Sequence, residues 1–359
     1  MNSRERVLRA LEHQDVDILP LNVGFGSMEA VRRFLGERFF EANDVDQKVF
    51  LAKLFKSDIV NFPTMGFPGG PGIFEEILFE GNEHIVAKTP VSGLVYWRKV
   101  PYFAKSLSGP VRYEEDLAKL ERPNIEEFKP KVTQMAKKVK KLQDMGYFVM
   151  SEIKGPLETP WMYLRGGPEN FFMDIVRRPA FAAKLIEFIF EPTIELAELV
   201  LDETHVDAIW MTDDLGETHA PFISPERYRV LIKPWHSEVV RRIHRKGAKL
   251  CLHSHGNIMP LLGEIVDTDP DSIDPLDIAD NISVTEVKER YGNQICLMGG
   301  ITKDIGRMTE NETSKHIQDM VKICGSHGYI IGTAGGVPSE MTLSQLNVFK
   351  DAIDKARKM

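Results

Sequence analysis

The order strand, helix, strand is visible in one continuous part of the chain, and it decides the fold class. VDAIWMT (206–212) and AKLCLHS (248–254) are short apolar runs, and SPERYRVLIKPWHSEVVRRIHRKG (224–247) lies between them. In this middle segment apolar residues recur every three or four positions, as on one face of a helix. The segment opens on a Ser-Pro pair and ends at a glycine, which are typical helix start and stop signals. Two strands joined by a helix predict a parallel sheet.

The same alternation continues outward in both directions and gives about eight strands. Eight parallel strands with crossover helices close into a (β/α)8, or TIM, barrel. The alternative is an open doubly wound sheet, which usually carries a glycine-rich phosphate loop after its first strand; VGFGSMEA (23–30) does not match that loop. We therefore predict an α/β fold with one TIM-barrel domain over residues 1–359. The further predicted strands are DILPLNVGF (17–25), SDIVNFPT (57–64), YFVMSEI (147–153), DSIDPLD (271–277), QICLMGG (294–300) and GYIIGTA (328–334).

One segment departs from this alternation. FEEILFEGNEHIVAKTPVSGLVYWR (74–98) contains two runs of alternating apolar and polar residues around the turn sequence EGNEH. That pattern is typical of an antiparallel hairpin. We predict a hairpin insertion over residues 74–98, in the first half of the barrel.

Composition limits the classes of function. The chain is 43% hydrophobic, which allows a large core, and its net charge of −8 gives no reason to expect nucleic acid or an anionic membrane. No apolar run is long enough to span a bilayer, and MNSRERVLRALEH (1–13) predicts a charged amphipathic helix instead of a signal peptide. The three cysteines form no CxxC pair, which favours a reducing compartment. We expect a cytoplasmic protein whose partners are small molecules or proteins.

The stretch LCLHSHGNI (250–258) places two histidines at the end of a predicted strand. Side chains alternate along a strand, so His253 and His255 share one face. The active site of a TIM barrel lies at the C-terminal ends of its strands, and two imidazoles plus a carboxylate suit a zinc ion with three protein ligands. The alternative is that His253 hydrogen-bonds a buried carboxylate, such as Asp213, without any metal.

Carboxylates follow other predicted strands. Asp213 and Asp214 come directly after a buried strand and are candidates for catalysis, although one of them could simply cap the next turn. Glu158 stands in an apolar setting, where a charge is costly unless it is paired or bound to metal; alternatively, backbone N–H groups at a helix start satisfy it. Asp274 ends another predicted strand and is a candidate for substrate binding, and Glu152 and the loop 332–336 lie at similar positions.

Apolar side chains near the strand ends are candidates for a substrate pocket. Phe25, Met65 and Phe67 lie in the loops that follow the first two predicted strands, and Trp161 and Met211 lie near the later ones. A mostly apolar lining with few polar groups is typical of small-molecule pockets. The alternative for each of these residues is an ordinary place in the core.

The chain resembles a known family in four runs: NSRERVLRALEHQDVDILP (2–20), DDLGETHAPFISPERYRVLIKPWHSEVVRRIHRKGAKLCLHSHGNI (213–258), LMGGITK (297–303) and GTAGGVPSEMTLSQLNVF (332–349). They resemble the uroporphyrinogen decarboxylase superfamily over nearly the whole chain, and within it the corrinoid-dependent methyltransferases, which are TIM barrels that move a methyl group between a cobalamin carrier protein and a substrate. The decarboxylases hold propionate groups with an arginine-containing RQAGRY-like motif after the first strand, where this chain reads LNVGFGSME (21–29).

GPLETPWMYLRGGPENFFMDIV (155–176), together with DDLG, ISPExYR, KPxH and HSxG, resembles the members that demethylate methoxylated aromatic compounds. The zinc-containing members that methylate thiols have an HxC motif and a later cysteine, and His255 and Gly335 stand at those cysteine positions here. The resemblance therefore implies transfer of the methyl group from a methoxyaromatic compound to cob(I)alamin. The chain has no cobalamin-binding DxHxxG motif, so the corrinoid belongs to a separate protein.

This resemblance implies roles for the candidate residues. Zinc would be held by His253, His255 and a third ligand, and zinc or a general acid would activate the ether oxygen as the methyl group leaves. The third ligand would be Glu158, Asp213 or Glu217, and the catalytic set would be Asp213, Asp214, His253 and Glu158. A corrinoid-to-thiol methyltransferase, a decarboxylase and a non-catalytic barrel stay open as alternatives, and the resemblance also suggests a homodimer.

Overall fold

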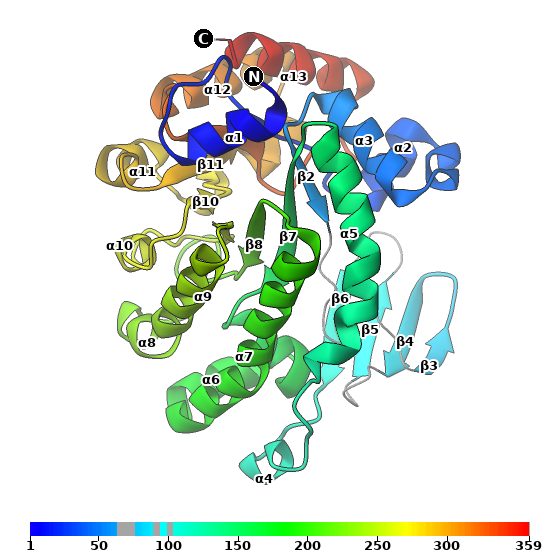
Figure 1. The fold of residues 1–359 in the computed structure, drawn as a ribbon, viewed down its shortest axis with the longest axis vertical. Coiled ribbons are helices and arrows are strands. Elements are labelled where there is room, and N and C mark those ends of the chain that lie inside the picture. Colours follow the sequence, from blue (N-terminus) through cyan, green and yellow to red (C-terminus); the bar gives the residue numbers. More distant parts are fainter. Residues whose placement is uncertain (63–75, 89–93, 99–102, 359) are drawn as a thin grey trace.

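Eight parallel strands form the centre of the molecule and pair with one another in chain order (Figure 1). The computed structural model describes residues 1–62, 76–88, 94–98 and 103–358. Every predicted barrel strand is present, and the predicted TIM barrel is confirmed. The strands are β1 (Leu21–Asn22), β2 (Ile59–Phe62), β7 (Phe148–Lys154), β8 (Ala208–Thr212), β9 (Lys249–His253), β10 (Ser272–Asp274), β11 (Cys296–Ile301) and β12 (Tyr329–Thr333).

Backbone and side-chain hydrogen bonds close the barrel between β1 and β2. The backbone N–H of Asp58 donates to the carbonyl of Leu21 over 2.7 Å, and the Leu21 N–H donates to the Asp58 carboxylate over 2.9 Å. The Ser57 hydroxyl also donates to the Leu21 carbonyl, over 3.0 Å. Arg6 and Arg357 donate to the buried Asp58 carboxylate, over 2.6 and 2.5 Å. One buried carboxylate thus ties this seam to both ends of the chain.

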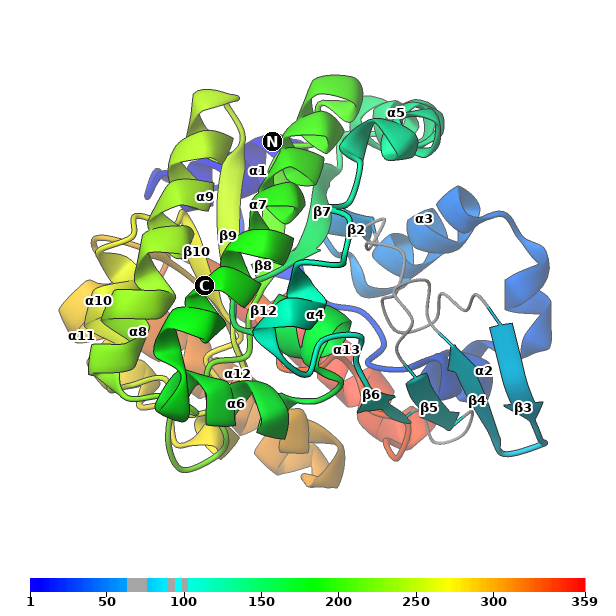
Figure 2. The ribbon, with the colours of Figure 1, turned by 90° about the horizontal axis from the view of Figure 1, so that it is seen from below.

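Helices surround the barrel, as Figures 1 and 2 show. The predicted helix 224–247 is two helices, because Ile232 ends one and begins the next, just before a proline that cannot donate a backbone hydrogen bond. None of the helices in the described ranges is long and apolar enough to cross a membrane. The helices are α1 (Ser3–Leu11), α2 (Met28–Leu35), α3 (Asp44–Phe55), α4 (Glu114–Leu117), α5 (Lys129–Asp144), α6 (Pro168–Arg177), α7 (Pro179–Thr204), α8 (Pro225–Leu231), α9 (Lys233–Arg245), α10 (Leu262–Val266), α11 (Val284–Tyr291), α12 (Glu310–Cys324) and α13 (Leu343–Ala356), with a π-helix over Pro160–Arg165 and 3-10 turns at Glu37–Glu41, Ile125–Phe128, Ile278–Asp280 and Lys303–Arg307.

The hydrophobic core has two parts, one on each face of the strands. Leu250 and Leu252 of β9 belong to the larger part, which lies between the strands and the helices. Cys251 belongs to the smaller part, together with Val7 and Leu11 of α1, which close the N-terminal end of the barrel. The side chains of β9 therefore alternate as predicted. His253, which follows in the same direction as Cys251, reaches the opposite, C-terminal mouth.

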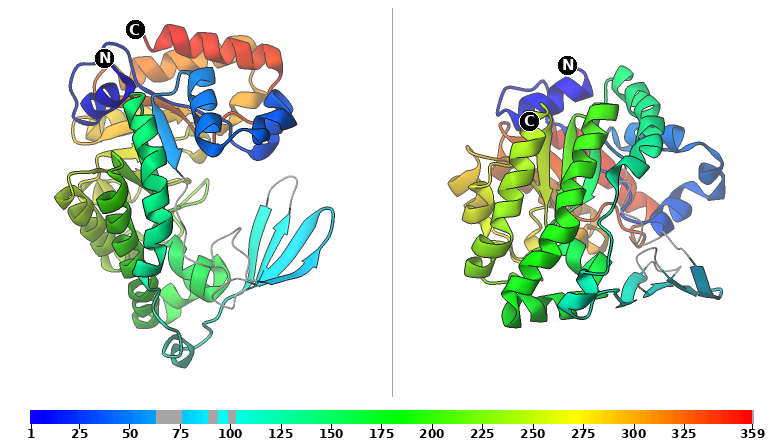
Figure 3. Two further views of the ribbon diagram at one scale, coloured as in Figure 1. Left: turned by 45° about the vertical axis from the view of Figure 1, so that its right-hand side comes forward. Right: turned by 60° about the horizontal axis from the view of Figure 1, so that its bottom comes forward.

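A separate sheet is inserted after β2. It has four antiparallel strands: β3 (Glu76–Glu80), β4 (His84–Lys88), β5 (Leu94–Arg98) and β6 (Phe103–Ser108). Strands β3 and β4 form a hairpin within the predicted range 74–98, and two further strands extend the sheet to Ser108. Residues 74 and 75 lie outside the described ranges. Figures 2 and 3 show the sheet to one side of the barrel, on the same side as α2 and α3.

Candidate active site

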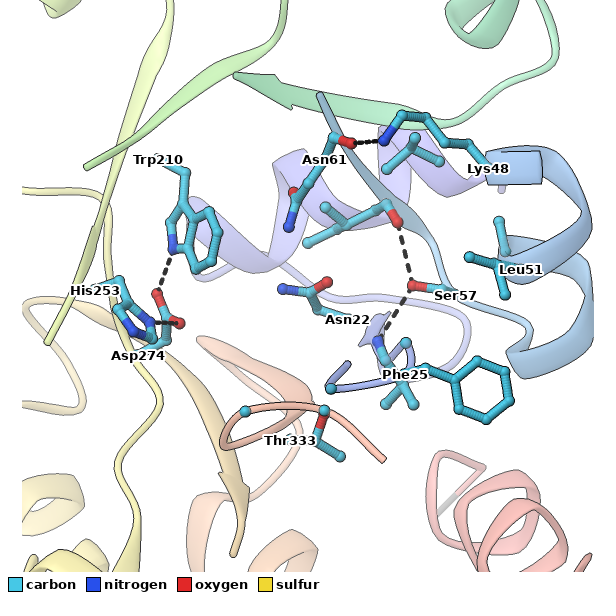
Figure 4. A pocket seen from close by; sticks show the side chains of 18 of the residues that line it. Asn22, Phe25, Lys48, Leu51, Ser57, Asn61, Trp210, His253, Asp274 and Thr333 are labelled. Atoms are coloured by element: carbon cyan, nitrogen blue, oxygen red, sulfur yellow. Dashed lines mark hydrogen bonds and ion pairs between the residues drawn. The ribbon is translucent and has the colours of Figure 1, made fainter. Parts of the chain in front are cut away.

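A cavity of about 510 Å³ lies in the C-terminal mouth of the barrel (Figure 4). Four of the predicted site residues line it, namely Phe25, His253, His255 and Asp274, and the predicted loop 332–336 contributes Thr333, Gly335 and Gly336. The two asparagines of its lining were not predicted. Asn22 and Asn61 are polar residues in otherwise apolar strands, which is the one signal that could have shown them. The lining residues are Asn22, Val23, Gly24, Phe25, Gly26, Lys48, Leu51, Ala52, Ser57, Ile59, Val60, Asn61, Trp210, His253, His255, Asp274, Thr333, Gly335 and Gly336.

His253 is held by a carboxylate on the neighbouring strand. Its Nδ1 lies 2.7 Å from one oxygen of Asp274, and the indole N–H of Trp210 donates to the other oxygen over 2.9 Å. A carboxylate only accepts hydrogen bonds, so Nδ1 carries a proton and Nε2 is left for other partners. Nε2 lies 4.0 Å from the carboxylate of Asp214. Burial lowers the pKa of His253, but Asp274 and Asp214 outweigh it, and the pKa lies above its ordinary value.

His255 lies against His253, as the alternation predicts. The two rings meet edge to face, with their centroids 4.8 Å apart, and His255 Nδ1 lies 3.7 Å from Asp280. Burial and the neighbouring His253 lower the pKa of His255. Gly256 follows in a left-handed conformation with φ of 88°, and a Cβ there would lie 2.1 Å from the backbone of Gly216. The glycine after the two histidines therefore lets two loops of the mouth cross in contact.

Glu158 and Lys154 form a second polar group at the end of β7. The ammonium of Lys154 donates to the Thr212 hydroxyl over 2.8 Å and lies 3.1 Å from Glu152 and 3.7 Å from Glu158. Burial of Glu158 raises the pKa of its carboxyl to about 8. Burial lowers the pKa of Lys154, but Glu158 in its ionised form and Glu152 outweigh this and raise it. Near pH 7, Glu158 therefore carries a proton in a mouth that also contains Asp214.

Asp213 and Asp214 occupy different environments. Asp213 is fully buried, and one of its oxygens accepts from the backbone N–H groups of Leu157 and Glu158, over 2.9 and 3.0 Å. Its other oxygen lies 2.9 Å from His236 Nε2. The Asp214 side chain is 41% exposed and accepts from the backbone N–H of His255 over 2.8 Å. Asp213 thus fixes the segment that carries Glu158, and Asp214 faces the mouth.

The predicted zinc ligands do not converge in this arrangement. Among the described residues, no three His, Cys, Asp or Glu side chains are grouped so that they could hold a metal ion. Glu217 is exposed, and its backbone bonds to Ala220 and Asn257. Because no third ligand joins the two histidines among the described residues, this set does not form the predicted three-ligand site, and a bound zinc stays a prediction. The contact between His253 Nδ1 and Asp274 leaves Nε2 open and does not itself oppose a metal.

The predicted apolar lining is divided between the cavity and the core. Phe25 lines the cavity and stacks on Phe34 at a centroid distance of 5.3 Å. Met211 is fully buried in the core, because alternation along β8 points it away from the side of Trp210. Trp161 is half-buried and packs against the same core. Met65 and Phe67 lie outside the described residues.

The chain is similar to one known protein family and to several solved structures. The family model of uroporphyrinogen decarboxylase (URO-D) matches residues 98–356. A methyltransferase from Methanosarcina mazei has a similar structure, with a TM-score of 0.73, 14% identity and 99% of both chains covered. A B12-independent methionine synthase from Shewanella sp. W3-18-1 has a TM-score of 0.51, 11% identity and 96% of both chains covered. A comparison with curated proteins finds no match. The two structural likenesses show a shared fold, and the family match covers most of the sequence, so the chain belongs to the uroporphyrinogen decarboxylase family.

Proposed function

We propose that the protein is an enzyme that moves the methyl group of a methoxylated aromatic compound to cob(I)alamin on a separate corrinoid protein. One observation carries this proposal: a cavity large enough for a substituted benzene ring is lined by His253, whose Nδ1 is fixed on Asp274 and whose Nε2 is free to serve a substrate. The similar folds of a methyltransferase and a methionine synthase support methyl transfer as the type of reaction.

The difficulty of this reaction is the leaving group. When the bond between the methyl carbon and the ether oxygen breaks, the electron pair stays on the oxygen, which is a poor leaving group unless it gains a proton. In our proposal His253 delivers the proton from Nε2 to that oxygen, so that a phenol leaves. The cob(I)alamin of the partner supplies the electron pair for the new bond to the methyl carbon.

The other groups of the mouth prepare His253 for this step. Asp274 holds the ring in one orientation, and Asp214, 4.0 Å from Nε2, stabilises the protonated imidazole. The high pKa of Glu158, about 8, keeps that carboxyl neutral and so limits the negative charge in the mouth. Asp213 acts indirectly, because it holds the backbone of Glu158.

The lining of the cavity favours this function over a decarboxylase that acts on polycarboxylic tetrapyrroles. Such a substrate needs cations to hold its carboxylates. Among the described residues that line the cavity there is no arginine, and Lys48 is the only lysine. A thiol methyltransferase with cysteine ligands gains no support either, because Cys251, Cys296 and Cys324 are all buried and none lines the described cavity.

The direct test mixes the protein with cob(I)alamin and a panel of methoxylated phenols, with and without zinc, and follows the absorbance of the corrinoid. We expect conversion to methylcobalamin and release of the demethylated phenol. The variant His253→Gln should lose this activity, whereas His327→Gln should keep it, since His327 bonds to Asp15 on the surface just before β12 begins. No conversion with any methoxyarene, together with turnover of a thiol or a carboxylated substrate, would overturn the proposal.

A further inference from the structure

Two asparagines line the wall of the cavity that faces His253. Asn22 ends β1 and Asn61 lies in β2, and Figure 4 shows both carboxamides directed toward the space between this wall and Trp210, His253 and Asp274. The backbone carbonyl of Asn61 accepts a hydrogen bond from Lys48, which fixes this part of β2. The carboxamides are thus placed on two strands, β1 and β2, opposite the proposed proton donor.

The two carboxamides lack strong partners within the described part of the chain. The Oδ1 atom of Asn61 is buried and has no hydrogen-bond partner among these residues. The Nδ2 of Asn22 has only the sulfur of Met298, at 3.6 Å, and a thioether is a weak acceptor. A buried polar group without a partner is costly, and native proteins keep one only where it has a use or where water or a ligand completes it. Both residues line the cavity, and Asn61 Oδ1 itself lies beneath its surface, so a donor of a ligand reaches this oxygen when the carboxamide rotates about its Cβ–Cγ bond.

The hydrogen-bond donors and acceptors of the two carboxamides determine which group of a ligand would bind them. A carboxamide offers both an acceptor and donors, so it matches a group that does the same, which a hydroxyl does and a methyl does not. A carboxylate could only accept and would leave Asn61 Oδ1 without a donor. Lys48 is the only lysine among the described lining residues; it is engaged with the Asn61 carbonyl and lies over the Phe62 ring, and burial lowers its pKa.

We propose that Asn22 and Asn61 bind a hydroxyl group on the aromatic ring and so determine which methoxylated compounds the enzyme accepts. This inference rests on the proposed function, since it assigns a second anchor to the same substrate. With the hydroxyl held at β1 and β2, the ring spans the cavity and its methoxy group can face His253. Compounds that carry a methyl or a carboxylate in place of that hydroxyl are then poorer substrates.

The test compares a methoxyphenol with the methoxytoluene of the same substitution pattern. We expect the wild type to prefer the methoxyphenol by at least about tenfold in kcat/KM. Asn61→Leu and Asn22→Leu should reduce this preference toward unity by slowing the methoxyphenol alone. Asn61→Asp, which keeps an acceptor, should retain the preference. Asn293→Leu changes an exposed asparagine outside the cavity and should leave both rates unchanged.

A binding experiment separates failure of this subsite from failure of the proposed function. Calorimetry with phenol and toluene, without any corrinoid, should show tighter binding of phenol to the wild type and loss of that difference in Asn61→Leu. If no methoxyarene reacts but this difference is found, the subsite stands and the proposed reaction falls. If the reaction occurs and folded Asn61→Leu and Asn22→Leu proteins keep the wild-type preference in both measurements, the subsite is overturned. Circular dichroism confirms that each variant is folded.

Discussion

The two walls of the cavity are built from different chemistry. On the wall from β8 to β10, polar groups are paired with one another: Asp274 holds both His253 and Trp210, and Asp214 lies beside the same imidazole. On the wall from β1 and β2, neutral carboxamides of Asn22 and Asn61 face the cavity without strong partners. A paired wall keeps one protonation state and one orientation, whereas an unpaired wall gains its partners from a substrate. Substitutions on the two walls test this division.

The largest effect is expected at the paired wall, on His253. His253→Gln keeps a side chain of similar size but removes the proton carrier, so kcat/KM for demethylation should fall by about 10²–10⁴-fold. Stopped-flow absorbance of the corrinoid measures this rate. If the loss is less than threefold, His253 is not the proton donor and the paired wall has another purpose.

The next largest effect concerns the stability of the same wall. Asp213→Ala removes the partner of His236 and of two backbone N–H groups in a fully buried site. Such a change is expected to lower the free energy of unfolding by about 3–5 kcal/mol. Asp213→Asn keeps an acceptor for the N–H groups of Leu157 and Glu158 and should cost less. Urea unfolding followed by fluorescence gives both values, and equal stability of the two variants would contradict this role.

Asp274→Asn leaves His253 in place but removes the carboxylate that orients its ring and raises its pKa. The pKa of His253 is raised by Asp274, so without this carboxylate the imidazole loses its proton at lower pH. The rate should fall about tenfold to a hundredfold, and the decline of kcat with rising pH should begin at a lower pH than in the wild type. A pH profile with an unchanged alkaline limb would show that Asp274 does not act through His253.

The fold could be predicted almost completely from the sequence, and the reason lies in the period of its apolar runs. Each barrel strand is a short buried run between turn residues, so local pattern alone locates it. The insertion extends beyond its predicted end because β6, which follows the predicted range, is recognised only through its pairing with β5. The break within 224–247 has a visible cause, Pro234, at a point where the apolar spacing still reads as one helix.

The sequence predicts which strand ends carry site residues, but it does not predict which of these residues bond to one another. His253 and Asp274 were found because both end a strand, and parallel neighbours bring such residues together; their register as opposite partners is a property of the sheet. Met211 could have been assigned to the core, because it alternates with Trp210. Asn22 and Asn61 belong to no motif, and apart from their place in otherwise apolar strands only the cavity distinguishes them from surface amides.

The smallest effect on activity is expected for Glu158→Gln, and it is the most informative about charge. Because burial raises the pKa of Glu158 to about 8, the wild type holds this carboxyl neutral at pH 7, and glutamine imitates that form. The rate at pH 7 should change less than about threefold if His253 is the donor.

The stability of Glu158→Gln relative to the wild type should depend on pH in one direction. The folded state holds the proton of Glu158 up to about pH 8, whereas the unfolded chain releases it above the ordinary pKa of 4.5. The free energy of unfolding therefore falls progressively as the pH rises from 4.5 through about 8. Glu158→Gln removes this loss, so its melting temperature should exceed that of the wild type above pH 7 and approach it near pH 4.5. A large loss of activity at pH 7 together with this stability profile would instead make Glu158 the proton donor, and the paired wall would then act through β7 as well as β9.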